Sequence, residues 1–225
     1  MAELIFEISV WVVPVVLAIT LHEAAHGYAA LRLGDDTALR MGRVSLNPLK
    51  HIDRFGTIVL PAILIMARAP FVFGWAKPVP INIRLLRSPK ADMVWVAAAG
   101  PLMNVLLAFM SALLMHVAVL LPSPADVWIL ETLRNSVFIN TILAVFNMIP
   151  IPPLDGGRVA VGLLPDFYSQ RLAGLEKYGM VILLGILILL PWLGTLVGIE
   201  VSLFSWVILP IVDAMIGAIV FMAGL

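Results

Sequence analysis

Residues 5–33 read IFEISVWVVPVVLAITLHEAAHGYAALRL, an apolar run long enough to cross a membrane as a helix. Its second half contains His22, Glu23 and His26, although a charged group inside a membrane costs roughly 2.5–3.5 kcal/mol on insertion scales. A helix places His22 and His26 one turn apart on one face, where both imidazoles can bind the same metal ion. Glu23 lies about 100° round the helix, where it can reach a water at the metal without being a ligand. The pattern therefore predicts a zinc site within a membrane-spanning helix.

The composition indicates a polytopic membrane protein with little mass left for a soluble domain. Of the 225 residues, 62% are hydrophobic and 12% are charged, whereas about a quarter of the residues in a soluble domain are charged. The formal net charge is zero, which argues against a nucleic-acid partner because proteins that bind nucleic acids carry a basic surface. The absence of cysteine excludes disulfides, thiolate zinc sites and cysteine nucleophiles.

The first apolar segment is predicted to be a retained transmembrane helix. Its N-terminal end, Met1–Val10, contains Glu3 and Glu7 and no basic residue, whereas a secretory signal peptide requires a positively charged start. Further helix candidates, each long enough to span about 30 Å of hydrocarbon, lie at residues 92–121, 131–149, 178–196 and 201–222.

We therefore expect an all-α polytopic membrane protein with about five to six transmembrane helices in one membrane-embedded domain over residues 1–225. The motif-bearing core is expected over about 5–165 and the C-terminal helices over about 176–222. Short strands at the membrane surface are predicted at Arg43–Leu46, where apolar and polar residues alternate, and at Val79–Ile83.

Segment 56–73 is predicted to be re-entrant or interfacial. Its uninterrupted apolar stretch, Thr57–Ala67, has only 11 residues, which is below the length that spans a bilayer. The flanking stretches Ala38–Phe55 and Gly74–Lys90 are both basic, and the positive-inside rule places both on the cytoplasmic side. A segment whose two ends lie on the same side does not cross the membrane.

A zinc ion held by two histidines requires at least one further protein ligand. The candidates are the histidine and acidic side chains of His51, His116, Asp155 and Asp213. If segment 56–73 does not cross, the first helix ends on the cytoplasmic side, the second leaves that side and the third returns to it. Asp155 then follows the cytoplasmic end of the third helix, at a depth similar to that of His26. This topology predicts Asp155 as the third ligand.

The sequence around Asp155 suits a site at membrane depth. Three prolines precede Asp155 and two glycines follow it, which forbids a regular helix before it and gives backbone freedom after it. Asn147, eight residues earlier, can present an amide to a developing oxyanion. His51 and Asp213 stay open as site residues, the alternatives being a surface imidazole and a carboxylate that pairs with another helix or lines a water path.

The chain resembles the site-2 protease family. His22–His26, HEAAH, and Asn147–Gly157, NMIPIPPLDGG, match the two signature motifs of that family, and Gly100–Asn104, GPLMN, matches a third pattern. The resemblance covers about Leu17–Leu164. It is to a compact form, because no PDZ or CBS region is recognisable.

The resemblance implies an intramembrane zinc metalloprotease that cuts transmembrane proteins or signal-peptide remnants. One Zn²⁺ per chain is implied, with His22, His26 and Asp155 as ligands and Glu23 as the catalytic carboxylate. Asn147 would assist the substrate or the transition state, and Asn104 would line the core.

The expected location is a prokaryotic plasma membrane, with the active site toward the cytoplasm. Two other functions stay open on the sequence alone. Intramembrane histidine and carboxylate side chains also suit a divalent-metal transporter, and a non-catalytic protein that binds single helices can keep the same motifs. The sequence indicates no particular oligomeric state.

Overall fold

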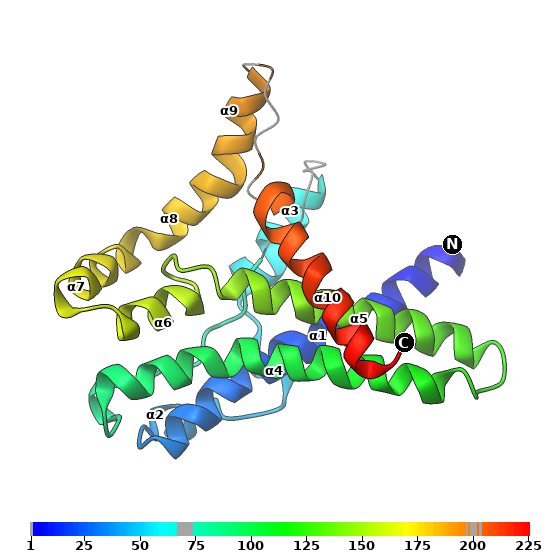
Figure 1. Cartoon of the computed structure of the whole chain (residues 1–225), viewed down its shortest axis with the longest axis horizontal. Helices are drawn as coiled ribbons and strands as arrows, with labels where there is room; N and C mark the ends of the chain where they lie inside the picture. The colour runs from blue at the N-terminus through cyan, green and yellow to red at the C-terminus, as the bar shows by residue number, and fades with distance from the viewer. Residues whose placement is uncertain (1, 67–73, 197, 199–201, 203) are drawn as a thin grey trace.

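The computed structural model describes residues 2–66, 74–196, 198, 202 and 204–225 (Figure 1). The fold is all-helical, as predicted. The α-helices are α1 (Ala2–Arg32), α2 (Thr37–Arg40), α3 (Leu60–Met66), α4 (Pro89–Ala118), α5 (Ala125–Asn147), α6 (Asp155–Leu163), α7 (Asp166–Gly174), α8 (Gly179–Leu184), α9 (Leu190–Leu196) and α10 (Leu209–Ala223). The 3-10 helices are η1 (Pro48–His51), η3 (Ile83–Leu85) and η4 (Glu176–Tyr178), and the π-helical turns are η2 (Arg54–Val59), η5 (Gly185–Leu189) and η6 (Phe204–Ile208).

Five helical runs are long and apolar enough to cross a membrane, which confirms a multi-pass membrane protein. They are Glu3–Arg32, Pro89–Ala118, Ala125–Asn147, Asp166–Leu196 and Phe204–Ala223. Large apolar side chains cover their outer faces, as a lipid environment requires; Trp95 of α4 is 65% exposed and Phe221 of α10 is 84% exposed.

Helices α1, α4 and α5 pack against one another and form the centre of the molecule (Figure 1). Small side chains are buried on these helices, which lets their backbones approach closely. Ala18 of α1 and Ala108 and Ala112 of α4 are fully buried. Helix α10 packs on α4 and α5 through Ile219 and Ala223. The run from α8 to α9 extends away from this centre in Figure 1.

The two predicted strands are wrong: within the described residues, Arg43–Leu46 and Val79–Ile83 form no strand. Pro78 and Pro80 lack the N–H groups that a ladder would need. These stretches are held instead by side chains, as when Arg43 Nη2 donates to the carbonyl oxygens of Lys77 and Pro78.

The start of segment 56–73 is hydrogen-bonded to Trp75, which follows the segment in sequence, as expected for a re-entrant or interfacial segment. The backbone N–H of Trp75 donates to the Gly56 carbonyl at 3.1 Å, and the Thr57 hydroxyl donates to the Trp75 carbonyl at 2.8 Å. Turn η2 and helix α3 form the first part of the segment. Residues 67–73, on which the rest of this prediction falls, lie outside the described residues.

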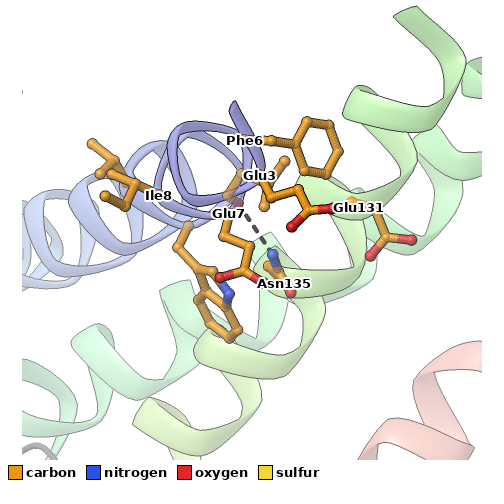
Figure 2. A pocket seen from close by; sticks show the side chains of 9 residues that line it. Glu3, Phe6, Glu7, Ile8, Glu131 and Asn135 are labelled. Atoms are coloured by element: carbon orange, nitrogen blue, oxygen red, sulfur yellow. Dashed lines mark hydrogen bonds between the residues drawn. The ribbon is translucent and has the colours of Figure 1, made fainter. Parts of the chain in front are cut away.

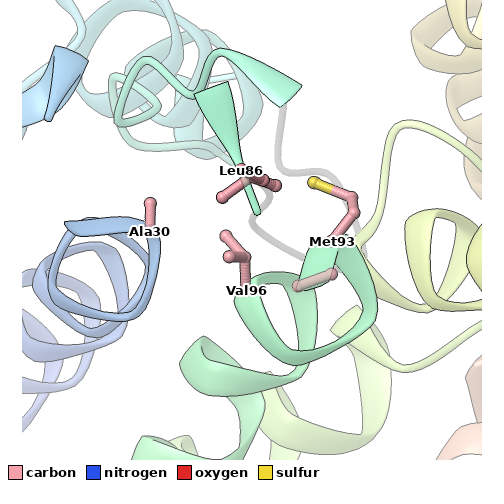
Figure 3. Close-up of a cluster of buried hydrophobic side chains, with 5 residues drawn as sticks. Ala30, Leu86, Met93 and Val96 are labelled. Carbon is pink, nitrogen blue, oxygen red and sulfur yellow. The ribbon is translucent and has the colours of Figure 1, made fainter. Parts of the chain in front are cut away.

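The chain between Asn82 and Pro89 is fixed to the end of α1. Figure 3 shows Leu86 lying between Ala30 of α1 and Met93 and Val96 of α4, and these four side chains belong to one buried apolar cluster. Asp35, which is fully buried, accepts hydrogen bonds from the backbone N–H groups of Thr37 and Asn82. Segment 74–82 is thereby held beside α1, next to the His-Glu motif.

Candidate metal centre

Two histidines of α1 and the first residue of α6 converge on one point. His22 Nε2 and His26 Nε2 are 3.1 Å apart, and Asp155 Oδ2 lies 3.1 Å from the first and 3.3 Å from the second. All three residues are buried. Metal–ligand bonds of about 2.0–2.1 Å in a tetrahedron separate neighbouring ligand atoms by about 3.3 Å. The three side chains therefore have the spacing of a zinc-ligand set.

The two imidazoles are oriented by acceptors on their other side. His22 Nδ1 lies 2.6 Å from Asn104 Oδ1, and His26 Nδ1 lies 2.7 Å from the Val96 carbonyl oxygen. Because both partners are acceptors, both Nδ1 atoms carry the proton, and both Nε2 lone pairs face the common point. Such partners fix the tautomer and ring orientation of metal-binding histidines.

The site contains acceptors but no donor to match them. Asp155 Oδ2 is buried without a hydrogen-bond donor in the described part of the chain, and it faces two imidazole lone pairs. Positive charge at this point, from a shared proton or a metal ion, favours the carboxylate. These three lone-pair-bearing atoms, His22 Nε2, His26 Nε2 and Asp155 Oδ2, thus fit a cation.

Gly100 of α4 leaves the space that a metal ion would need. A Cβ atom at this position would overlap His26 Nε2 and would lie 2.6 Å from His22 Nε2. The GPLMN pattern therefore contributes to the centre twice, because Gly100 gives room and Asn104 orients His22.

The local chain around Asp155 explains how it reaches the histidines. Helix α5 ends at Asn147 and α6 begins at Asp155, with three prolines in the turn between them. Gly156 packs directly on the backbone carbonyl of Met148, where a Cβ would overlap it. This close approach holds the start of α6 against Met148, directly after α5, while α6 itself packs on α4.

Glu23 lies outside the three-ligand cluster, as the helix geometry predicts. Its Oε2 accepts a hydrogen bond of 2.9 Å from the backbone N–H of Val79, and its side chain is half-buried.

Asn147 does not join the centre in the described structure. Its amide donates to the Leu143 carbonyl of its own helix at 3.0 Å, so a role in catalysis stays a prediction.

A buried polar network behind His22 was missed from the sequence. Asn104 is fully buried and donates from Nδ2 to Asn140 Oδ1 at 2.8 Å. Asn140 in turn donates to the Ser136 carbonyl, and Ser136 pairs with Ser111 through their hydroxyls. The signal that could have found it is the spacing of Ser136 and Asn140, which lie one turn apart on one face of α5.

The other ligand candidates lie elsewhere. His51 is buried and bonds to the Ser45 carbonyl, His116 bonds to the Ala223 carbonyl, and Asp213 is exposed on α10. Among the described residues, Asp155 is the candidate that meets both histidines.

Two hollows flank the helix that carries the motif. One of about 420 Å³ lies between α1 and α4, lined by apolar side chains that include Ala24, Ala25 and Leu102. The other, of about 1160 Å³, lies at the N-terminal ends of α1 and α5, where Glu3 and Glu7 approach Glu131 and Asn135 (Figure 2). Val12, the lining residue of this second hollow that is nearest to Glu23 along α1, precedes it by 11 helical residues, or about 17 Å.

The chain is similar to proteins described as zinc metalloproteases. Residues 117–191 match the model of peptidase family M50. The relative named "Putative zinc metalloprotease YwhC", from Bacillus subtilis (strain 168), is 37% identical over 177 residues, which is 77% of each chain. Rip2 from Mycobacterium tuberculosis (strain ATCC 25618 / H37Rv), with the same descriptive name, is 27% identical and covers 84% of this chain and 70% of its own.

No solved structure matches the chain. Identity of 37% over most of both sequences establishes the family, and five apolar spans place the protein in a membrane. The chain belongs to peptidase family M50, the site-2 protease family, and is a membrane metalloprotease.

Proposed function

We propose that the chain is an intramembrane zinc endopeptidase that cleaves transmembrane segments or signal-peptide remnants. The observation that carries this proposal is the convergence of His22 Nε2, His26 Nε2 and Asp155 Oδ2 within 3.3 Å of one another, with Glu23 beside them. In this proposal the three are the ligands of one zinc ion per chain. Glu23 and Asn147 act on the substrate.

The donor set supports zinc over the harder divalent cations. Two imidazole nitrogens and one carboxylate oxygen match catalytic zinc sites, which use three protein ligands and keep one position open. Magnesium and calcium prefer sites built from oxygen ligands. Relatives whose printed names say zinc metalloprotease also support this choice.

Zinc in such sites acts as a Lewis acid on a carbonyl group and activates water near neutral pH. Glu23 receives the proton of the attacking water and passes it to the leaving amine. Its carboxylate is held ready for this transfer, because Oε2 is fixed by the Val79 N–H. Asn147 requires a changed side-chain conformation to reach a reacting carbonyl, since its amide is bonded to Leu143.

An apolar peptide is the substrate class that the surroundings of the centre favour. The hollow between α1 and α4 is lined by apolar side chains, including the two alanines of the HEAAH motif. A helical substrate must unwind locally before cleavage, because helical hydrogen bonds occupy its carbonyl groups.

The site is proposed to lie near the cytoplasmic face of a prokaryotic plasma membrane. The HEAAH motif occupies the end of α1 that leads into Ala38–Phe55, and segment 74–90 returns to the same end. Both stretches are basic, and basic loops remain on the cytoplasmic side.

Purified protein in liposomes tests the proposal. A panel of tagged signal peptides and single-span proteins is incubated with the wild type and with Glu23→Gln, and bound zinc is measured in both. We expect cleavage of at least one panel member by the wild type, a loss of at least about 100-fold in Glu23→Gln, and one zinc per chain in each.

Two further measurements separate the alternatives. His22→Ala is expected to lose the bound zinc, and retained metal would contradict the ligand assignment. Metal flux into the liposomes without cleavage of any substrate would favour a divalent-metal transporter. Substrate capture without cleavage by the zinc-loaded wild type would favour a binding protein.

A further inference from the structure

The carboxylate of Glu23 is held by a part of the chain that carries none of the signature motifs. Val79 N–H donates to Glu23 Oε2 at 2.9 Å across 56 residues of sequence. Val79 is itself buried, with 6% of its surface exposed. The position of Glu23 therefore depends on the contacts that fix the backbone at Val79.

We propose that Arg43 is a positioning residue for Glu23, acting through the backbone of Lys77–Val79. Arg43 touches neither the metal ligands nor Glu23; it sets where the Val79 N–H lies. This inference rests on the proposed function for its catalytic consequence, while the contact chain stands on geometry alone.

Arg43 binds the two carbonyl groups that immediately precede Val79. Its Nη2 donates to the Lys77 carbonyl at 2.6 Å and to the Pro78 carbonyl at 3.3 Å. The side chain is buried, with 7% of the residue exposed, and no carboxylate pairs with it among the described residues. A buried guanidinium held by backbone carbonyls fixes the conformation of the segment that supplies them.

The segment is also fixed on both sides of Val79. The Lys77 N–H donates to the His51 carbonyl at 2.9 Å, and the Asn82 N–H donates to Asp35 Oδ2 at 2.6 Å. Lys77 is thus bound at its N–H and at its carbonyl, which leaves Val79 two residues from a doubly anchored point.

The face of α1 that receives Val79 is shaped for close approach. Gly27 lies one turn after Glu23, and a Cβ at Gly27 would lie 3.3 Å from Val79 Cγ1 and 3.2 Å from Val44 Cγ2. A glycine here lets the residue next to Arg43 and the residue bonded to Glu23 rest on the same helix face.

The sequence of the segment leaves one donor for Glu23. Residues 78 and 80 are prolines, so the Val79 N–H is the single backbone donor between Lys77 and Ile81. Proline also restricts φ on both sides of Val79.

The test compares Arg43→Ala with Arg40→Ala, a matched loss of an arginine three residues away. Arg40 is exposed and pairs with Asp36. For zinc-loaded protein, we measure kcat and KM on the substrate identified in the cleavage panel. We also measure hydrogen exchange at Val79 in peptides that start at Lys77. Because residues 78 and 80 are prolines and have no N–H, Val79 carries the one exchanging amide between Lys77 and Ile81. Arg43→Lys and Gly27→Ala serve as second variants in case Arg43→Ala fails to fold.

We expect Arg43→Ala to lower kcat about 10- to 100-fold, as for a slightly misplaced catalytic group, with KM changed less than about threefold and zinc retained. Exchange at Val79 should become at least about tenfold faster, Arg43→Lys should restore part of both, and Gly27→Ala should lower kcat in the same direction. Arg40→Ala should match the wild type.

An unchanged kcat in zinc-loaded Arg43→Ala would overturn the positioning role, as would a lowered kcat with unchanged exchange at Val79. If Arg43→Ala does not fold, wild-type kcat in both Arg43→Lys and Gly27→Ala overturns it. The two proposals can fail separately. If the wild type cleaves nothing, the proposed peptidase function is refuted. If Arg43→Ala and Glu23→Ala nevertheless both exchange faster than the wild type at Val79, the contacts from Arg43 through Val79 to Glu23 are supported.

Discussion

Asn104 determines which nitrogen of His22 faces the metal centre. Its Oδ1 accepts from His22 Nδ1 at 2.6 Å, and Asn140 fixes the amide from behind. We predict that Asn104→Ala weakens zinc binding by about 10- to 100-fold, the usual cost of losing a partner that orients a metal ligand. Competition with a chelator of known affinity measures the change.

Asn147→Ala is the control for that measurement, because Asn147 bonds to its own helix. It should bind zinc as tightly as the wild type even if its activity falls. Equal zinc affinities for Asn104→Ala and the wild type would show that His22 does not need the amide.

Gly100 contributes space, and its replacement should abolish the centre. A Cβ at this position would overlap His26 Nε2, and α4 cannot easily withdraw because it packs on α1, α5 and α6. We predict that Gly100→Ala loses bound zinc and activity together. Gly217→Ala in α10, where an added Cβ meets nothing within 4 Å, should retain both, as measured by metal analysis of the purified proteins.

At the scale of elements, Asp35 connects the end of α1 to the segment that carries Val79. Burial raises the pKa of Asp35, but hydrogen bonds from Thr37 and Asn82 outweigh burial and lower it below its usual value. Because this pKa is lower in the folded than in the unfolded protein, ionised Asp35 stabilises the fold. The stabilisation is complete above the unfolded-state pKa of about 3.9. This contribution is lost as the pH falls through the lower pKa of the folded state.

Asp35→Asn should therefore destabilise the protein by about 1–3 kcal/mol at pH 7, because an amide can accept from only one of the two N–H groups that now donate to Asp35. The difference in melting temperature from the wild type in detergent should narrow as the pH falls below about 4. Asp36→Asn, an exposed neighbour, is the control. A difference that stays constant from pH 7 to pH 3 would contradict the ionic role of Asp35.

The elements that the sequence predicted are those whose formation the membrane dictates. Long apolar runs became α1 and α4 within three residues of their predicted bounds, and α5, which begins six residues earlier than predicted, because a lipid-exposed backbone must satisfy its own hydrogen bonds. Arg43–Leu46 and Val79–Ile83 were predicted wrongly as strands, because alternation is a weak signal where prolines remove donors and side chains supply the bonds.

The topology predicted Asp155 as the third ligand; the structure places its Oδ2 close to both histidines, and its role as a ligand stays a prediction. The partners of the site residues were not predictable from the sequence. Val79 reaches Glu23 across 56 residues and Asn104 reaches His22 across 82, and no local pattern encodes contacts of that separation.

At the scale of the whole molecule, the orientation of the later helices depends on whether the segment between Gly56 and Trp75, which are hydrogen-bonded to each other, crosses the membrane. If the segment between them returns to its starting side, α1 and α5 both end on the side of the basic stretches, and Asp155 follows from that side. The proximity of Asp155 to His22 and His26 agrees with this arrangement. The loop between α4 and α5 then lies on the opposite face of the membrane.

Single-cysteine labelling tests this arrangement without background, because the chain has no cysteine. Leu49, 73% exposed in η1, and Leu120, 79% exposed after α4, lie on opposite faces in the proposed topology. In intact bacterial cells, a membrane-impermeant maleimide should label Leu120→Cys, whereas Leu49→Cys should react only after the cells are permeabilised. Reaction of both positions from outside would show that α4 does not separate them, and the reversed pattern would place the metal centre toward the outer face.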